Sequence, residues 1–374
     1  MLHIFEHFDP DGGYASGIDN VIQELAKNSK DTDLILVGVT NNPNYQLGKI
    51  TFHPKLKNAS FLPVAKLEKQ KFKRHKYIPH SIKYGVGLLR FRKNIQPQII
   101  HSHRIEIGFL VAIFWPKAIL IQFIHNARKN LTNSRSDSAW KHFQIFYRIL
   151  EDIVRKKAKK ILVFNQKEFE RLSLNNSSVY RCFTWYDPKI FNPKQNTMDS
   201  KSTIQIAWVG RLDSQKNPSL LIDIALELKN KNLDFEIHIY GKGELEVPLR
   251  KLVEEKNLTR SIFFEGLVIR ELLADKLKSS DILLMTSIYE GSPTILVEGL
   301  ACGIPVVCTQ ESDPDQVIQN GTNGYRLHKN EISEITKFVT NALNLNKDAI
   351  ANSVKNRSAL ILIPELLKDS LMAH

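Results

Sequence analysis

The chain has 374 residues, of which 43% are hydrophobic and 24% are charged. These values are typical of a folded protein with enough apolar side chains for two cores, and they exclude a disordered or fibrous chain. Three cysteines are too few and too scattered for a disulfide framework or a zinc site, so they predict a protein of the reducing cytoplasm.

The net charge of +13 is concentrated in the first half of the chain. Residues 1–190 hold 31 Lys and Arg against 15 Asp and Glu, a net +16, whereas residues 191–374 hold 21 against 24, a net −3. Residues 55–93 alone carry twelve basic side chains and one acidic one. This asymmetry predicts that one domain meets a polyanion, such as a membrane surface, a lipid phosphate or a nucleic acid. A solvated positive face that keeps the protein soluble is the alternative.

Strand and helix patterns alternate along nearly the whole chain, which predicts parallel sheets covered on both faces. In the first half, the predicted elements are a helix at 18–27, strands at 34–39, 98–101 and 118–124, and a helix at 140–157. In the second half, strands at 203–209, 235–240, 262–264, 282–285 and 305–308 alternate with helices at 218–228, 245–255, 271–278, 294–301 and 332–345. The longest apolar stretch, 107–124, is split by Pro116 and Lys117, so it predicts a buried helix followed by a buried strand.

Residues 187–202 are rich in Pro, Asn, Lys and Ser and lack apolar periodicity, which predicts a linker. We therefore expect one doubly wound domain at 1–190 and a second at 191–352. A C-terminal helical segment at 353–374 is expected to pack back toward the N-terminal domain. Two such domains would place a cleft at the carboxyl ends of both sheets, where these folds bind ligands.

Two loops of the second half carry charged residues in places where such folds bind ligands. Arg211 and Lys216 lie between a predicted strand and the following helix, where an anion would meet both their charge and the amide groups of the helix start. Glu290 and Glu298 lie eight positions apart around the start of a later helix, whose first amides offer a second phosphate cradle. The alternatives are a solvated loop for the cations, a charge at a helix N-terminus for Glu290 and a solvent-facing turn for Glu298.

The run at 280–307, SDILLMTSIYEGSPTILVEGLACGIPVV, resembles the C-terminal signature of glycosyltransferase family 4, whose members are retaining enzymes. The segments WVGRLDSQKNPSLLI at 208–222, YGKGEL at 240–245 and FEGL at 264–267 fall in the order and spacing of that family. The resemblance spans most of the second half and is loose in the first. It implies an α/β protein of GT-B fold, with two Rossmann-like doubly wound domains facing across a cleft.

The resemblance also implies which residues would bind the donor. Arg211 and Lys216 would neutralise the diphosphate of a nucleotide-sugar, Glu290 would bind hydroxyls of the transferred sugar, and Glu298 would bind the ribose hydroxyls. The other expected donor-binding residues lie in glycine-rich turns, beside the base or around the helix start, and they are Gly12, Gly13, Gly210, Gly241, Gly243, Leu267, Val268, Gly291, Ser292, Pro293, Thr294, Ile295 and Leu296.

Histidines follow two predicted strands of the first half. His101 and His103 end one strand, and His125 and Asn126 end the next, so we expect all four on the acceptor side of the cleft. A His-x-His pair can bind a metal ion, but it lacks a third ligand nearby in the sequence. The resemblance implies that His125 lies close to the reacting sugar during a front-face attack, where it orients or stabilises the transition state. Arg211, Lys216 and Glu290 are the other expected catalytic residues.

Two Asp-Pro-Asp segments, at 9–11 and 313–315, could be mistaken for the metal-binding Asp-x-Asp of the other major glycosyltransferase fold. Because Arg211 and Lys216 can neutralise the diphosphate, we expect no metal ion, and no cofactor besides the nucleotide-sugar itself. A metal-dependent transferase is the alternative, and activity in excess chelator separates the two.

The basic segment of the first half contains Ile78, Ile82, Val86 and Leu89 at helical spacing. This pattern suits a helix lying on an anionic membrane. It equally suits a surface helix whose apolar stripe packs on its own domain. Peripheral attachment at the inner face of the plasma membrane is therefore a hypothesis.

Together, these patterns predict a retaining, metal-independent transferase that moves a hexose-type sugar from a nucleoside-diphosphate-sugar to a hydroxyl of a sugar or lipid-linked acceptor. Its product would belong to a cell-surface polysaccharide, a lipopolysaccharide or a glycolipid. A catalytically silent nucleotide-sugar-binding protein and a nucleic-acid-binding module are the alternatives. The basic half carries no known nucleic-acid motif, so we do not expect nucleic acid as a partner. UDP and GDP donors are not distinguished by these residues.

Overall fold

The structure is a computed structural model, and it forms two compact units. The first unit comprises Met1–Phe183 and Leu360–His374, and the second comprises Thr184–Ala359. The described residues are 1–12, 17–29, 33–66, 80–125, 128, 142–174, 176–193, 203–328 and 332–371. Gly13, Ile78 and Asn126 lie outside them. Each unit is described by itself below.

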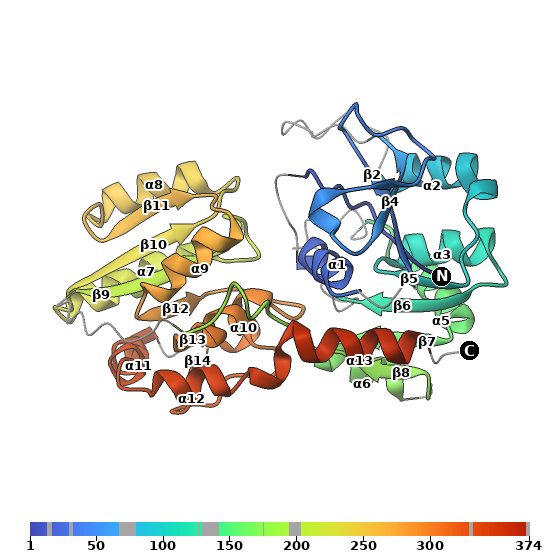
Figure 1. The fold of residues 1–374 in the computed structure, drawn as a ribbon. Coiled ribbons are helices and arrows are strands. Elements are labelled where there is room, and N and C mark those ends of the chain that lie inside the picture. The colour runs from blue at the N-terminus through green and yellow to red at the C-terminus, as the bar shows by residue number, and fades with distance from the viewer. Residues whose placement is uncertain are drawn as a thin grey trace. The chain divides into compact units, whose positions relative to one another are not determined.

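The first unit is built on an eight-stranded sheet with the order β3-β4-β2-β1-β5-β6-β7-β8 (Figure 1). Its strands are β1 (Leu2–Phe5), β2 (Leu34–Val39), β3 (Thr51–Phe52), β4 (Ser60–Ala65), β5 (Ile99–Ser102), β6 (Ile119–Ile124), β7 (Lys160–Val163) and β8 (Val179–Arg181). All neighbours pair in parallel except β3 and β4, which are antiparallel. β1 lies in the middle and is buried along its whole length, as expected for a parallel strand covered on both faces.

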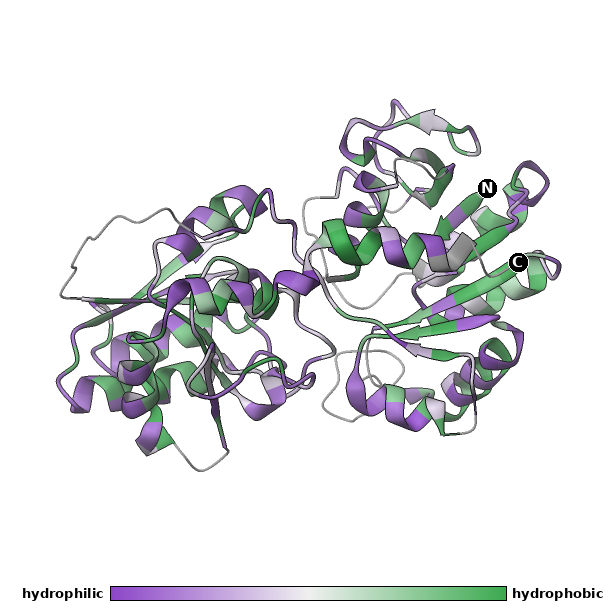
Figure 2. Cartoon of the chain, turned by 60° about the horizontal axis from the view of Figure 1, so that its bottom comes forward, coloured by the Kyte–Doolittle hydropathy of each residue, from purple (hydrophilic) through white to green (hydrophobic). Residues whose placement is uncertain are grey.

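Helices cover this sheet and bury a continuous apolar core. They are α1 (Gly17–Lys27), α2 (His80–Phe91), α3 (Ile105–Phe114), α5 (Gln144–Lys157), α6 (Gln166–Ser173) and α13 (Ala359–Leu371), with short 3-10 turns η1 (Pro54–Leu56) and η2 (Arg92–Asn94). α2 packs against α3, and α3 against α5 (Figure 1). Tyr84, Val111 and Leu150 from these three helices meet Phe5 and Val37 of the sheet in one core. Figure 2 shows the mostly hydrophobic strands inside and helices that carry both hydrophobic and hydrophilic residues.

The second unit has a six-stranded parallel sheet with the order β11-β10-β9-β12-β13-β14. Its strands are β9 (Ile204–Val209), β10 (Phe235–Tyr240), β11 (Ile262–Gly266), β12 (Ile282–Met285), β13 (Val306–Thr309) and β14 (Gly324–Leu327). Its helices are α7 (Pro218–Asn230), α8 (Glu246–Glu255), α9 (Arg270–Lys278), α10 (Thr294–Ala301), α11 (Ile335–Ala342) and α12 (Lys347–Asn352), with 3-10 turns η4 (Gln310–Ser312), η5 (Ile332–Glu334) and η6 (Lys355–Arg357). One apolar cluster lies on each face of the sheet.

The strand order of the second unit determines where a ligand can bind. The chain winds outward from β9 through β10 to β11, and then returns to start again at β12 on the other side of β9. In sheets of this kind, ligands bind in a crevice at such a switch point, so the carboxyl ends of β9 and β12 are the expected place for one. The first unit has the same switch between β1 and β5. The predicted α/β fold class, with two Rossmann-like domains, is confirmed.

Two details of chain organisation concern the predicted domain limits. The first unit ends at Phe183, a few residues before the predicted limit, and α13 packs within this unit. At the edge of the second unit, the amide of Ala359 donates to the carbonyl of Tyr186 at 2.9 Å, so the segments that enter and leave this unit are tied together. No helix within the described part of the chain has the length and apolar character needed to span a membrane.

Candidate functional site

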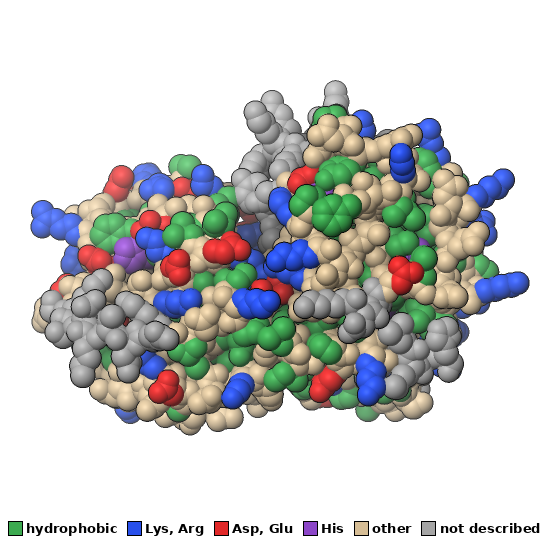
Figure 3. Space-filling view, in the orientation of Figure 1, with side chains coloured by type: hydrophobic (Ala, Val, Ile, Leu, Met, Phe, Trp, Pro, Cys, Tyr) green, Lys and Arg blue, Asp and Glu red, His purple; other side chains and the backbone are tan. Residues whose placement is uncertain are grey.

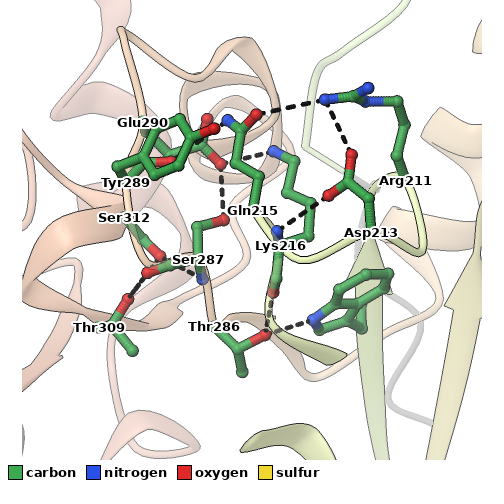
Figure 4. Close-up of polar contacts among 11 residues, drawn as sticks. Arg211, Asp213, Gln215, Lys216, Thr286, Ser287, Tyr289, Glu290, Thr309 and Ser312 are labelled. Carbon is green, nitrogen blue, oxygen red and sulfur yellow. Dashed lines mark hydrogen bonds and ion pairs between the residues drawn. The ribbon is translucent and has the colours of Figure 1, made fainter. Parts of the chain in front are cut away.

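The predicted donor-binding residues gather where β9 and β12 end side by side in the second unit. The loop after β9 carries Arg211 and Lys216, and the loop after β12 carries Glu290 (Figure 4). Lys216 Nζ lies 2.5 Å from Glu290 Oε1, and the Ser287 hydroxyl donates to the same oxygen at 2.6 Å. The Lys216 side chain is 17% exposed and that of Glu290 is 7% exposed. The structure thus brings a nearly buried cation and carboxylate together at the crevice.

Hydrogen bonds hold the two loops in place against one another (Figure 4). The Lys216 amide donates to Asp213 Oδ1 at 3.1 Å, and the Thr286 hydroxyl donates to the Lys216 carbonyl at 2.8 Å. Gln215 Nε2 donates to the carbonyl of Tyr289 at 3.2 Å. Because backbone groups of both loops take part, the position of the Lys216–Glu290 pair is set before any ligand binds.

Arg211 stands at the edge of this network. Its Nη2 lies 2.9 Å from Asp213 Oδ2 and donates to Gln215 Oε1 at 3.2 Å. The side chain is 66% exposed, so its ion pair contributes little to stability. Its guanidinium is nevertheless held beside the crevice, where a phosphate could engage it. The solvated-loop alternative thus describes Arg211 in part, but it does not describe Lys216.

Two of the expected donor-binding glycines, Gly241 and Gly243, allow close packing within the second unit. Gly241 has a φ of +151°, and a Cβ there would lie 1.8 Å from the Gly210 carbonyl oxygen. A Cβ on Gly243 would lie 2.2 Å from the carbonyl oxygen of Leu212. Only glycine lets the loops after β9 and β10 approach this closely. The tight packing of the two loops therefore explains both glycines without reference to a nucleotide.

Glu298 lies inside α10 and is buried, so the predicted alternative of a solvent-facing turn is wrong. Its Oε1 accepts a hydrogen bond from Arg270 Nη2 at 2.8 Å. Arg270 begins α9, and its guanidinium lies 5.3 Å from the ring centroid of Phe191. An ion pair thus offsets the cost of this carboxylate on an apolar helix. The sequence indicates Glu298 but not Arg270, whose position just after the FEGL segment is its only signal.

The remaining expected donor-binding residues surround the start of α10 or the end of β11. Gly291, Ser292 and Pro293 lead into α10, which begins at Thr294 and continues through Ile295 and Leu296. The Ser292 hydroxyl donates to Asp315 Oδ2 at 2.6 Å, so it helps to hold this loop in place. Leu267, after β11, is 47% exposed, whereas Val268 packs against the core.

The Asp-Pro-Asp segment of the second unit has a structural role. Asp313 is buried, and its carboxylate accepts hydrogen bonds from the amides of Val317 and Ile318 at 2.8 and 2.9 Å. Near the N-terminus, Asp9 Oδ1 accepts from the amide of Asp11, which forms a turn before Gly12. No group of three potential metal ligands occurs among the residues that the structure describes.

The histidines of the first unit divide into a core residue and a pair. His101 is fully buried within β5, so it cannot contact a ligand directly. His103 Nδ1 lies 2.9 Å from Nε2 of the partly exposed His125, across the ends of β5 and β6. Burial lowers the pKa of both His101 and His125 to about 3 and that of His103 well below its usual value, so all three rings are neutral.

An ion pair beside these histidines was not predicted. Glu6 follows β1, and its buried Oε1 lies 2.5 Å from Arg104 Nε, at the start of α3. Burial raises the pKa of Glu6, and the Arg104 charge opposes this effect. The pair places a half-exposed guanidinium at the carboxyl ends of the central strands, next to His103 and His125. Glu6 and Arg104 are 98 positions apart, and no local pattern links them.

Most of the second unit is similar to a known protein family. Residues 190–357 match the family model described as glycosyl transferases group 1. Over these residues, the chain is similar to group 1 glycosyltransferases. The matched residues include both loops of the Lys216–Glu290 pair as well as Arg270 and Glu298. The match thus covers most of the second unit.

The curated proteins that the chain matches are distant in sequence. The chain is 24% identical over 221 residues to a poly(ribitol-phosphate) alpha-N-acetylglucosaminyltransferase of Staphylococcus aureus (strain COL). This match covers 59% of the chain and 42% of the relative. It is 23% identical over 290 residues to the UDP-Gal:alpha-D-GlcNAc-diphosphoundecaprenol alpha-1,3-galactosyltransferase of Escherichia coli, which covers 73% of the chain and 72% of that relative. The chain therefore matches less than half the length of the first of these relatives.

Solved structures share the fold over the whole chain. Sucrose-phosphate synthase from Thermosynechococcus elongatus superposes with a TM-score of 0.77 at 15% identity, covering 100% of this chain and 99% of that one. Anabaena HepE in complex with UDP and glucose gives a TM-score of 0.73 at 14% identity and covers both chains completely. These neighbours are GT-B glycosyltransferases, and the fold is therefore of the GT-B type.

Acid should destabilise the protein through its buried neutral histidines. An unfolded histidine binds a proton near pH 6.5, whereas folded His101 does so only near pH 3, so stability falls as the pH drops through this window. We expect His101 alone to contribute a loss of about 1 kcal/mol between about pH 7 and pH 5.5. Urea unfolding at both pH values, followed by tryptophan fluorescence, measures the loss. The His101→Phe variant should lose about 1 kcal/mol less than the wild type, and an equal loss would contradict this assignment.

Proposed function

We propose that the protein transfers a hexose-type sugar from a nucleoside-diphosphate-sugar to an acceptor hydroxyl, with retention of configuration. The observation that carries the proposal is the Lys216–Glu290 pair at the topological switch of a unit similar to group 1 glycosyltransferases. A cation and a carboxylate in one crevice match the two chemical parts of such a donor. Lys216 can face the diphosphate, and Glu290 can accept hydrogen bonds from sugar hydroxyls.

The other residues of the domain complete the proposed donor site. Arg211, held at the edge of the crevice, adds a second cation for the departing diphosphate. Glu298 binds the ribose hydroxyls, and its pairing with Arg270 holds the carboxylate in place to accept hydrogen bonds. Because Lys216 and Arg211 can neutralise the diphosphate, we propose that transfer needs no metal ion. The retaining mechanism and membership of glycosyltransferase family 4 are part of the same proposal.

We further propose that the acceptor belongs to a cell-surface polymer or its lipid-linked precursor. Two relatives support this step by their names, since one acts on poly(ribitol-phosphate) and the other on a diphosphoundecaprenol-linked sugar. For the donor, HepE is described in complex with UDP-glucose, which supports a UDP-sugar. The basic first unit would suit an acceptor carried on phosphate.

The donor-site proposal predicts the behaviour of Glu290→Gln. The amide keeps the size of the side chain and the hydrogen bond from Ser287, but it removes the charge that faces Lys216. We expect kcat/KM for sugar transfer to fall by about 100-fold or more. Transfer assays with a nucleotide-sugar and a lipid-linked acceptor measure it.

Glu246→Gln is the matched control, because Glu246 forms an ion pair with Arg250 on the surface of α8 in the same unit. This variant should transfer sugar at the wild-type rate. Equal activity of the two variants would show that Glu290 takes no part in the reaction.

We also propose that the first unit attaches to an anionic membrane at the inner face of the plasma membrane. On α2, the apolar stripe of Ile82, Val86 and Leu89 points to solvent, with side chains 54%, 62% and 58% exposed. The described part of this stripe therefore does not pack on its own domain. Arg92 and Lys93, which follow α2, are exposed as well. An apolar stripe flanked by cations is the pattern of a helix that lies at a membrane surface.

The neighbouring helices extend this surface. On α5, Ile145, Phe146 and Ile149 are exposed. Ile113 is exposed on α3, which packs against both α2 and α5. Figure 3 shows Lys and Arg side chains projecting from the first unit on the side where Figure 1 places α2 and α3. Seven exposed apolar side chains thus lie on three helices that pack one against the next, and such a group is a candidate for a membrane contact.

Vesicle flotation tests the attachment. The wild type should float with vesicles that contain anionic phosphatidylglycerol at low salt, and less so with neutral phosphatidylcholine vesicles. Replacing Ile82, Val86 and Leu89 together with Gln should reduce the partition coefficient about tenfold or more, because three apolar side chains no longer enter the interface. Val247→Gln, which changes an exposed apolar residue on the second unit, should leave flotation unchanged. A wild type that fails to float at low salt would disprove the attachment.

A further inference from the structure

Two imidazole rings share a hydrogen bond at the carboxyl ends of β5 and β6. His103 Nδ1 and His125 Nε2 are 2.9 Å apart, and the ring planes differ by only 22°. The ring centroids are 5.2 Å apart, about the longest separation that this N···N distance allows, so the nitrogens face each other nearly in the plane of both rings, which is the geometry of an N–H···N hydrogen bond. One of the two nitrogens must carry the proton, and the other must accept it.

The surroundings of the pair keep both rings neutral and fixed. His125 stacks on Phe164, with centroids 4.6 Å apart and planes within 15°, and His103 stacks on Phe123 at 4.3 Å. Burial and the nearby Arg104 charge both lower the pKa of His125. For His103, burial lowers the pKa most, and His125, His101 and Arg104 lower it further. Neutral imidazole has one N–H and one lone-pair nitrogen, so each ring carries its proton on either Nδ1 or Nε2.

The far nitrogen of His103 decides between the two arrangements. His103 Nε2 is buried and has no hydrogen-bond partner among the described residues. If His125 donated to His103 Nδ1, the proton of His103 would have to sit on Nε2, as a buried N–H without an acceptor. If His103 donates instead, only a lone pair stays unpaired there. In folded proteins, a buried N–H group without an acceptor is rarer than a buried acceptor without a donor.

We propose that His103 is a positioning residue that sets the tautomer of His125. His103 donates its Nδ1–H to His125 Nε2, and His125 consequently carries its own proton on Nδ1. The partly exposed His125 then presents an N–H, and it acts as a hydrogen-bond donor to a substrate oxygen instead of a general base. This assignment rests on the proposed function only in placing the reacting sugars near His125.

Nitrogen NMR of the full chain tests the tautomer without any substrate. In long-range proton–nitrogen spectra of the ¹⁵N-labelled protein, the His125 ring should show a protonated Nδ1 and an unprotonated Nε2 at neutral pH. The signals missing from a His125→Asn variant assign this ring. A wild-type His125 that is protonated on Nε2 would overturn the proposal.

Two substitutions of His103 separate positioning from packing. His103→Asn places an amide N–H₂ near the position of Nδ1 and should preserve the His125 tautomer. His103→Phe keeps an aromatic ring against Phe123 but cannot donate, so the His125 proton should move to Nε2 or exchange between both nitrogens. A His125 tautomer unchanged in His103→Phe would overturn the proposal. If His103→Phe does not fold, the folded His103→Asn variant provides the test. A His125 ring that is no longer protonated on Nδ1 in His103→Asn would also overturn the proposal.

Transfer kinetics give the second readout. We expect His103→Phe to lower kcat about tenfold or more while KM for the nucleotide-sugar stays near the wild-type value, and His103→Asn to retain most of kcat. Equal kcat in the wild type and His103→Phe would contradict a positioning role. A wild type that transfers no sugar would disprove the proposed function. The NMR measurement of the His125 tautomer does not depend on that result.

Discussion

The contact between Lys216 and Glu290 is the interaction on which the candidate donor site depends. It joins loops 74 positions apart in sequence, and these loops meet because β9 and β12 are parallel neighbours that end at the same edge of the sheet. Hydrogen bonds from Thr286 and Gln215 to backbone carbonyls fix both loops around the pair. A carboxylate as buried as Glu290 would be costly without a cation beside it. The same pair thus makes the crevice both stable and chemically suited to an anionic sugar donor.

The first unit repeats this arrangement with different chemistry. Its sheet switches direction between β1 and β5, and the residues that follow these strands form the Glu6–Arg104 ion pair. The neutral pair of His103 and His125 lies beside it. In each unit, an ion pair with a buried carboxylate thus lies at the carboxyl ends of the strands on either side of the switch point, where such folds bind ligands. In the second unit the charges suit a diphosphate, whereas in the first they suit hydrogen bonding to hydroxyl or phosphate oxygens.

Local patterns predict much of this architecture. The strands β2, β10 and β12 and the helix α10 have the predicted bounds. Largely apolar runs mark β2 and β12, whereas apolar residues alternate with Glu236 and His238 in β10. β4 was not predicted, since Pro63 interrupts its apolar run, and β8 has only three residues. For α2, helical spacing predicts a stripe of apolar residues, but spacing alone cannot show whether the stripe faces the core or the solvent.

Residues that act through distant partners are beyond prediction from one sequence. Lys216, Arg211, Glu290 and Glu298 belong to runs with recognisable spacing, so their proximity to a ligand can be predicted. Arg270 lies 28 positions from Glu298, and its role is evident only once α9 and α10 are folded. His101 shows the converse case, since its place at a strand end suggested the crevice, yet its side chain lies in the core.

Calorimetric titration with a panel of UDP- and GDP-sugars tests the central claim most directly. The account predicts that at least one nucleotide-sugar binds the wild type in excess chelator, and that Lys216→Ala weakens binding of both this ligand and its free nucleoside diphosphate. Glu290→Gln should weaken the nucleotide-sugar but leave the nucleoside diphosphate nearly unaffected. Binding of a nucleotide-sugar at wild-type affinity by both variants would contradict the assignment of the donor site to this pair.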